Sequence, residues 1–147
     1  MGNPNIKSNE IATLISTIDP DATTAATYLT AAIDLGNFES CMAIVLAGTL
    51  GSSATIDAKL VQATTSGGTY KDVTGKAITQ LTQAGTDSNK QAIINCRSDE
   101  LDVANGYRYV KLSMTVGTAT SDAGAVLLGF HPRYAPATDA TTVDEVV

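Results

Sequence analysis

Few side chains in this sequence could act as catalytic acids, bases or nucleophiles, and they are widely separated. His131 is the only histidine among the 147 residues. A serine or cysteine partner for it would need a strained, exposed turn such as the G-x-S-x-G elbow, and no segment of the sequence has that pattern. We therefore interpret His131 as a structural or interface residue and predict that the protein is not an enzyme.

The two cysteines, Cys41 and Cys96, are too few and too far apart for a metal-binding motif. Each lies in an apolar stretch, where a free cysteine usually behaves as a small buried hydrophobic residue. We predict that role for both, with a disulfide between neighbouring strands as the alternative. Neither interpretation provides a cofactor or metal site.

Acidic residues occur close together at two places. Asp19 and Asp21 flank a proline, which predicts a turn, and the acids of residues 99–102 predict a solvated loop. Either group could hold calcium through carboxylate oxygens, but the D-x-D spacing is common by chance and a full calcium-loop pattern is missing. A carboxylate pair for glycoside hydrolysis is compatible with the sequence, yet no tryptophan is present to stack on a sugar. We predict no metal site and no catalytic site here.

A glycine pair at Gly67-Gly68 is the only candidate for a phosphate-binding loop. It lacks the Lys-Ser or Lys-Thr that completes a P-loop, and no helical pattern follows it. We predict a hairpin turn instead.

Composition and charge exclude two classes of partner. The net charge is −6, and the nine Lys and Arg residues are scattered from Lys7 to Arg133 without forming a cationic cluster. Nucleic acid is therefore not an expected partner. The longest apolar run, Met42 to Ala47, is far too short to span a bilayer, and the N-terminal residues lack a secretory signal pattern. We expect a protein made in a reducing cytoplasm.

The elements of the chain follow a rhythm of short apolar runs separated by Gly, Asn, Asp and Ser clusters, which is typical of strands and turns. The predicted strands are residues 11–18, 27–35, 41–47, 54–63, 70–73 continuing into 77–81, 91–97, 107–116 and 123–130. Residues 98–104 predict a single helical turn. About eight short strands in one chain of 15.1 kDa predict an all-β fold, namely a single-domain antiparallel β-sandwich or jelly roll.

The segment 107–116 alternates most strictly. One set of side chains is apolar and consists of Val110, Leu112, Met114 and Val116. The other set, predicted to face solvent or a partner, consists of Tyr109, Lys111, Ser113 and Thr115.

The two ends of the chain lack this alternation and are rich in Asn, Pro, Thr and Asp. We predict an N-terminal arm over residues 1–10, a β-sandwich domain over 11–130 and an extended C-terminal arm over 131–147. The arms are expected to grip neighbouring subunits, because prolines pre-order an extended backbone and lower the cost of ordering it on binding. The predicted partner-interface residues are Ile6, Ile11, Phe130, His131, Pro132, Tyr134 and Pro136.

Two segments, residues 54–75 and residues 106–136, have a pattern found in one class of virion protein. The first runs from Ala54-Thr55-Ile56-Asp57 to Asp72-Val73-Thr74-Gly75, and the second from Gly106-Tyr107-Arg108-Tyr109 to Arg133-Tyr134-Ala135-Pro136. In that order they resemble the decoration, or cement, proteins that stabilise the heads of tailed bacteriophages. The resemblance covers roughly residues 40–137 and is one of pattern rather than of an invariant motif.

This resemblance implies a β-sandwich core, attachment to the major capsid protein on the outer surface of the virion, and assembly in the host cytoplasm. It also implies a homo-oligomer, with a trimer preferred by analogy to local three-fold positions. It supplies no catalytic, cofactor or metal residues. The alternatives are a carbohydrate- or host-binding β-sandwich module and another phage head or tail component.

Overall fold

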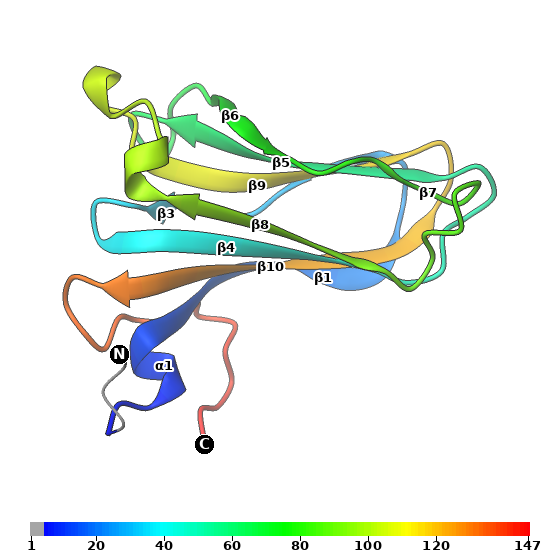
Figure 1. Cartoon of the computed structure of the whole chain (residues 1–147). Coiled ribbons are helices and arrows are strands. Elements are labelled where there is room, and N and C mark those ends of the chain that lie inside the picture. The colour runs from blue at the N-terminus through cyan, green and yellow to red at the C-terminus, as the bar shows by residue number, and fades with distance from the viewer. Residues whose placement is uncertain (1–4) are drawn as a thin grey trace.

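A computed structural model describes residues 5–147, and these residues form two antiparallel β-sheets that enclose one hydrophobic core (Figure 1). The first sheet has the strand order β1-β10-β4-β8, and the second has β2-β9-β5-β6, with β3 added on β9 and β7 added on β5. The strands are β1 (Ala12–Thr23), β2 (Ala26–Leu29), β3 (Ile33–Asp34), β4 (Phe38–Ala47), β5 (Thr55–Ala63), β6 (Lys71–Ala77), β7 (Leu81–Thr82), β8 (Gln91–Arg97), β9 (Tyr109–Gly117) and β10 (Ser121–Pro132). The prediction of an all-β, single-domain antiparallel sandwich is confirmed.

Strict alternation of small and branched apolar residues builds the core. Each strand sends every second side chain inwards, so Leu60 of β5, Leu112 of β9 and Leu127 of β10 meet between the sheets and are fully buried. The apolar set predicted for residues 107–116 is among the most buried in the protein.

Short helical turns lie at the ends of strands. The α-helix α1 (Ser8–Ile11) precedes β1, and the 3-10 turns η1 (Ser98–Glu100) and η2 (Val103–Asn105) follow β8. The single helical turn predicted for residues 98–104 is thus present as two 3-10 turns. In the described part of the chain, no helix has the length and apolar character of a membrane span.

One predicted strand end is wrong. Asp19-Pro20-Asp21 was expected to close the first strand, but β1 continues to Thr23, with a register shift against β10 between Ile18 and Asp21. Proline is tolerated because β1 is an edge strand. Gly124 of β10 lies against this irregularity, where a Cβ atom would come within 2.9 Å of the Ile18 carbonyl oxygen and the Pro20 Cα. Only glycine leaves room for the shift.

The predicted strand 27–35 is divided into β2 and β3. At Thr30 a side-chain hydrogen bond replaces one of the two backbone bonds to β9. The Leu112 N–H donates to Thr30 Oγ1 (3.0 Å), while the Thr30 N–H donates to the Leu112 carbonyl (3.1 Å). The next residue, Ala31, donates its N–H to Ser16 Oγ of the other sheet (2.9 Å). A hydroxyl that competes with backbone pairing is invisible to a count of apolar periodicity.

Residues 65–68 form the predicted hairpin turn. The Gly68 N–H donates to the Thr65 carbonyl (3.1 Å), and the turn joins the antiparallel strands β5 and β6.

Candidate interaction surface

The outer face of the four-stranded sheet β1-β10-β4-β8 is apolar. Its strands alternate, so the residues between those of the core point away from it. Register places Val126 of β10, Ile44 of β4 and Ile93 of β8 in one row across the sheet, and Leu128 and Met42 in the next. We define the apolar face as the side chains of Leu14, Met42, Ile44, Leu46, Ile93, Val126, Leu128 and Phe130.

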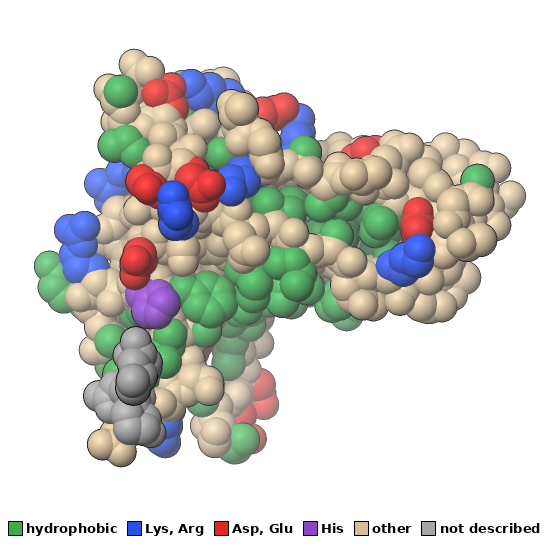
Figure 2. Space-filling model, viewed as in Figure 1, with side chains coloured by type: hydrophobic (Ala, Val, Ile, Leu, Met, Phe, Trp, Pro, Cys, Tyr) green, Lys and Arg blue, Asp and Glu red, His purple; other side chains and the backbone are tan. Residues whose placement is uncertain are grey.

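None of these eight side chains belongs to the buried core. Ile93 is 58% exposed and Leu46 is 41% exposed, and the other six are partly exposed. Figure 2 shows the hydrophobic side chains as a band across the middle of the molecule, with few charged groups inside it. An antiparallel sheet with one solvated face normally carries polar residues there, and a contiguous exposed apolar patch usually marks an interaction site.

On β10, β4 and β8 the charged residues of this face lie at its corners. Arg97 stands at the end of β8 and Asp122 near the start of β10, while the positions between them are apolar or uncharged. Depletion of charge in the centre, with polar groups at the rim, is the composition of protein–protein interfaces.

The outer face of the second sheet is polar. Lys59 of β5 forms an ion pair with Asp72 of β6 (Nζ–Oδ1 2.8 Å), and Asp57 accepts a hydrogen bond from the Gln80 side chain (2.7 Å). Thr27 and Thr115 form a hydroxyl–hydroxyl hydrogen bond across β2 and β9 (2.9 Å). This face is therefore the solvated side of the sandwich.

The predicted interface residues gather at one end of the four-stranded sheet. Pairing of Ala12 with Phe130 brings the end of α1 beside His131. Tyr134 is 79% exposed; Ile6, His131 and Pro136 are also exposed, and the remaining predicted residues, Ile11, Phe130 and Pro132, are partly buried. Only Phe130 also belongs to the apolar face. The His131 Nδ1 lies 3.5 Å from Glu39 Oε2.

The other residues of the apolar face were not predicted from the sequence. The run of residues 41–47 is nearly all apolar, which is also expected of a strand buried on both faces, but only Cys41, Ala43, Val45 and Ala47 are buried there. A signal was present, because an antiparallel strand with one solvated face should alternate, and this one is apolar on both faces.

The C-terminal segment after β10 lies against its own chain. The Ala140 N–H donates to the Leu14 carbonyl (2.7 Å), and the Leu14 N–H donates to Asp139 Oδ1 (2.8 Å). The Arg133 N–H donates to the Asn37 carbonyl (2.8 Å). The bonds of Asp139 and Ala140 satisfy the backbone N–H and C=O groups that Leu14 presents at the free edge of β1. Binding of a neighbouring subunit by residues 131–147 stays a prediction. The same role for residues 1–10 also stays a prediction, and residues 1–4 lie outside the described part of the chain.

Cys41 and Cys96 lie directly opposite each other on β4 and β8 and are both free and buried. The prediction that they act as small buried side chains is confirmed. A hydrogen bond with Cys96, together with burial, raises the pKa of the Cys41 thiol. A thiol held in its neutral form is a poor nucleophile.

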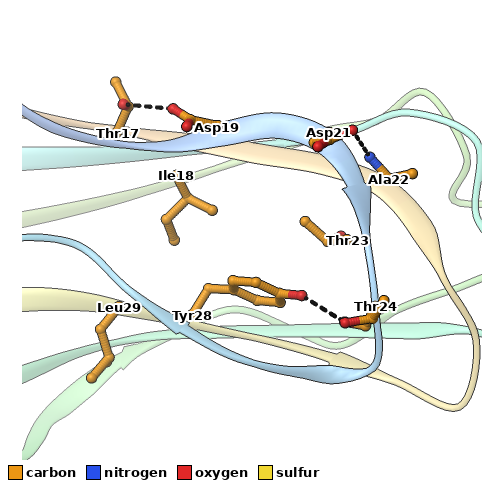
Figure 3. A pocket seen from close by; sticks show the side chains of 9 residues that line it. All are labelled: Thr17, Ile18, Asp19, Asp21, Ala22, Thr23, Thr24, Tyr28 and Leu29. Atoms are coloured by element: carbon orange, nitrogen blue, oxygen red, sulfur yellow. Dashed lines mark hydrogen bonds between the residues drawn. The ribbon is translucent and has the colours of Figure 1, made fainter. Parts of the chain in front are cut away.

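A pocket of about 370 Å³ lies between β1 and β2 (Figure 3). Ile18 and Tyr28 point into the space between the strands, whereas the carboxylates of Asp19 and Asp21 lie along β1. Asp19 accepts a hydrogen bond from the Thr17 hydroxyl (3.4 Å), and Asp21 from the Ala22 N–H (2.7 Å). The two acids do not converge on a common point.

The acids of residues 99–102 are held apart by separate cations. Asp99 pairs with Arg97 (2.9 Å), Glu100 with Lys76 (2.8 Å) and Asp102 with Lys71 (2.5 Å). A hydrogen bond from Lys71 lowers the pKa of Asp102. Across residues 5–147, no three His, Cys, Asp or Glu side chains are placed so that they could share a metal ion.

Comparisons with known proteins identify no relative by sequence, since no family model matches the chain and no curated protein matches it. Among solved structures, it is similar to a chain of Broad bean stain virus, with 10% sequence identity, a TM-score of 0.46, and coverage of 100% of this chain and 97% of the viral one. It is also similar to a chain of the empty virus-like particle of Cowpea mosaic virus, with 10% identity, a TM-score of 0.38, and coverage of 91% and 87%.

Proposed function

We propose that this protein is a structural, non-catalytic component of a virion that binds the outer surface of a bacteriophage capsid and stabilises contacts between major capsid protein subunits. The observation that supports this function best is the apolar face. Eight aliphatic and aromatic side chains cover one side of a sheet whose other side already forms the core. A face of this kind is stabilised when a partner protein covers it.

The energetics of such a role follow from mass action. A protein that binds only the assembled shell stabilises the shell in proportion to the number of sites that are occupied. Removing apolar surface from water contributes about 25 cal/mol per Å², and a specific interface buries about 800 Å² per partner. The apolar face supplies the centre of such an interface, and the exposed residues around Tyr134 and Pro136 extend it at one end.

A carbohydrate-binding function is less well supported, because only Tyr134 of the five tyrosines is highly exposed (79%) and the other four do not form an open stacking platform. Lys71 Nζ lies 4.0 Å from the centroid of Tyr107, Lys111 Nζ lies 4.6 Å from that of Tyr70, and the Arg108 guanidinium lies 5.3 Å from that of Tyr109. A cation covers one face of each ring, and the Tyr28 hydroxyl is bound to Thr24.

The test is binding to purified capsids of the virus that encodes the protein, imaged with and without it. Ile44→Lys places a charge in the middle of the apolar face, and we expect it to weaken capsid binding by about a hundredfold or more. Thr115→Lys makes the same change on the polar face and is the matched control. Attachment of native protein at ordered positions is expected. Equal binding by Ile44→Lys and native protein would contradict the assignment of this face, and no binding by native protein would contradict the function.

A further inference from the structure

Three of the four sheet edges are blocked, and one is open. The β1 edge carries Pro20 and register shifts, and residues Asp139 and Ala140 cover it at Leu14. The β2 edge is only four residues long. The β6 edge carries Lys71, Asp72 and Lys76, a glycine at positive φ, and a register shift against β5. Such features keep natural sheets from adding further strands.

β8 has none of these features. Its seven residues, QAIINCR, contain no proline and no lysine, and they pair with β4 in uninterrupted register. The Ala47 N–H donates to the Lys90 carbonyl just beyond the strand, which marks that position as a hydrogen-bonded pair. Because such pairs alternate along an antiparallel ladder, Ala92, Ile94 and Cys96 bond to β4, whereas Ile93 and Asn95 point their backbone groups to the free edge.

No residue within 5–147 satisfies these edge groups. The Arg97 N–H is bound by the Glu100 carboxylate (2.8 Å), which closes the strand at its end. The N–H and C=O groups of Ile93 and Asn95 have no backbone or side-chain hydrogen bond in the described part of the chain. Ile93 is also the most exposed side chain of the apolar face.

We propose that β8 is a homodimerisation edge, at which two copies of this chain pair antiparallel through β8 and form one continuous eight-stranded sheet. In the proposed register Ile93 of each copy lies opposite Asn95 of the other, with the two-fold axis at Ile94. Each Ile93–Asn95 pair then exchanges two main-chain hydrogen bonds, and the groups left open in the single chain are satisfied.

Charges at the ends of β8 fit a second copy in this register. Lys90 comes opposite Ser98, one residue from Asp99 of the other copy, and Arg97 comes opposite the uncharged Gln91. No like charges are opposed, and the two apolar faces join side by side into a surface twice as wide. Pairing through a two-fold axis uses β8 of both copies and closes at two, unlike the trimer expected by analogy.

Sedimentation velocity on the isolated full-length chain tests the proposal. We expect a monomer–dimer equilibrium that shifts with concentration, because edge pairing buries less area than a large obligate interface. Ile93→Pro removes an N–H that the single chain does not use, at an edge position where proline fits. Ile93→Lys adds a charge at the same place. Both variants should remain folded by circular dichroism and lose dimerisation at least about tenfold.

The matched control is Leu29→Lys, because Leu29 is 57% exposed on the edge of the other sheet. It should dimerise as the native chain does. In a mixture of Ile93→Cys and Asn95→Cys chains, mild oxidation should produce the mixed cross-linked dimer in preference to either homodimer. A native chain that stays monomeric, a trimer, or folded Ile93 variants that dimerise normally would overturn the proposal. None of these outcomes depends on capsid binding, which is measured separately.

Discussion

The outer faces of the two sheets differ, although the strands that carry them share one core. The face on β9, β5 and β2 has ion pairs and hydroxyl hydrogen bonds, as expected where a sheet meets water. The face on β10, β4 and β8 continues the apolar character of the core to the outside. The polar face is favourable in contact with water, whereas the apolar face would be stabilised by contact with a partner protein. Exposed positions on one sheet can therefore be as apolar as the buried positions of the core.

The largest expected effect is a loss of folding stability that differs between the two sides of β10. Leu127 is fully buried between the sheets, and its neighbour Leu128 points to the apolar face. Leu127→Ala should lower the free energy of unfolding by about 2–5 kcal/mol because it leaves a cavity. Leu128→Ala should cost less than about 1 kcal/mol in the isolated chain and should instead weaken the proposed binding to the capsid. Chemical denaturation of both variants measures the difference, and equal losses would show that Leu128 is part of the core.

The polar sheet should be the more sensitive of the two to acid. Burial opposes ionisation of Asp34, but hydrogen bonds from the Arg108 guanidinium and the Gly36 N–H outweigh it and lower the pKa of that carboxyl. A lowered native pKa contributes stability above the unfolded value near 4, and this contribution is lost as the pH falls through the native value.

Asp34→Asn should therefore destabilise the protein by about 1–2 kcal/mol at neutral pH, and native and variant stabilities should converge at low pH. Urea denaturation over a pH series measures this. A difference that persists unchanged at the acid end would contradict the ion-pair explanation.

A smaller effect is expected at the covered edge of the apolar sheet. Asp139→Ala removes the acceptor for the Leu14 N–H and should cost about 1 kcal/mol. Hydrogen exchange should increase at Leu14 while the middle of β4 stays protected. Asp144→Ala, in the same segment but without a described bond to β1, is the matched control. If exchange at Leu14 does not change, the segment does not protect this edge in solution.

The smallest effect concerns the inner side of β1. Thr13 is fully buried, and its hydroxyl has no hydrogen-bond partner within the described residues. Thr13→Val replaces the unsatisfied hydroxyl with a methyl group of similar size and should raise the stability by about 0.5–1 kcal/mol. Thr30→Val is the contrasting variant, because its hydroxyl accepts from the Leu112 N–H, and it should be destabilising.

Periodicity predicted most of the fold, and the reasons for its failures are physical. Every predicted strand overlaps one or two observed ones, because alternation and turn residues act locally. β1 extends past Pro20 because an edge strand tolerates proline and Gly124 leaves room beside it. The break at Thr30 depends on a hydroxyl bond to a residue 82 positions away, which no local pattern records.

The candidate site was less predictable than the fold. Sequence patterns indicated the ends of the chain as contact segments, and those residues do gather at one end of the four-stranded sheet. The apolar face was missed, because side chains from four strands far apart in the sequence combine to form it. An all-apolar strand such as residues 41–47 can either be buried on both faces or have one face exposed on an apolar surface. Only its register against the neighbouring strands distinguishes these two arrangements.

The short helix α1 and Val147 lie at the same end of the sandwich, where the C-terminal segment returns to β1 (Figure 1). A peptide or fluorescent protein fused after Val147 would therefore emerge beside α1 and away from the loop that joins β7 to β8. Cargo attached there would lie at the same end of the sheet as the exposed residues around Tyr134 and Pro136, so a bulky fusion at this point would report whether that end of the molecule has to stay accessible.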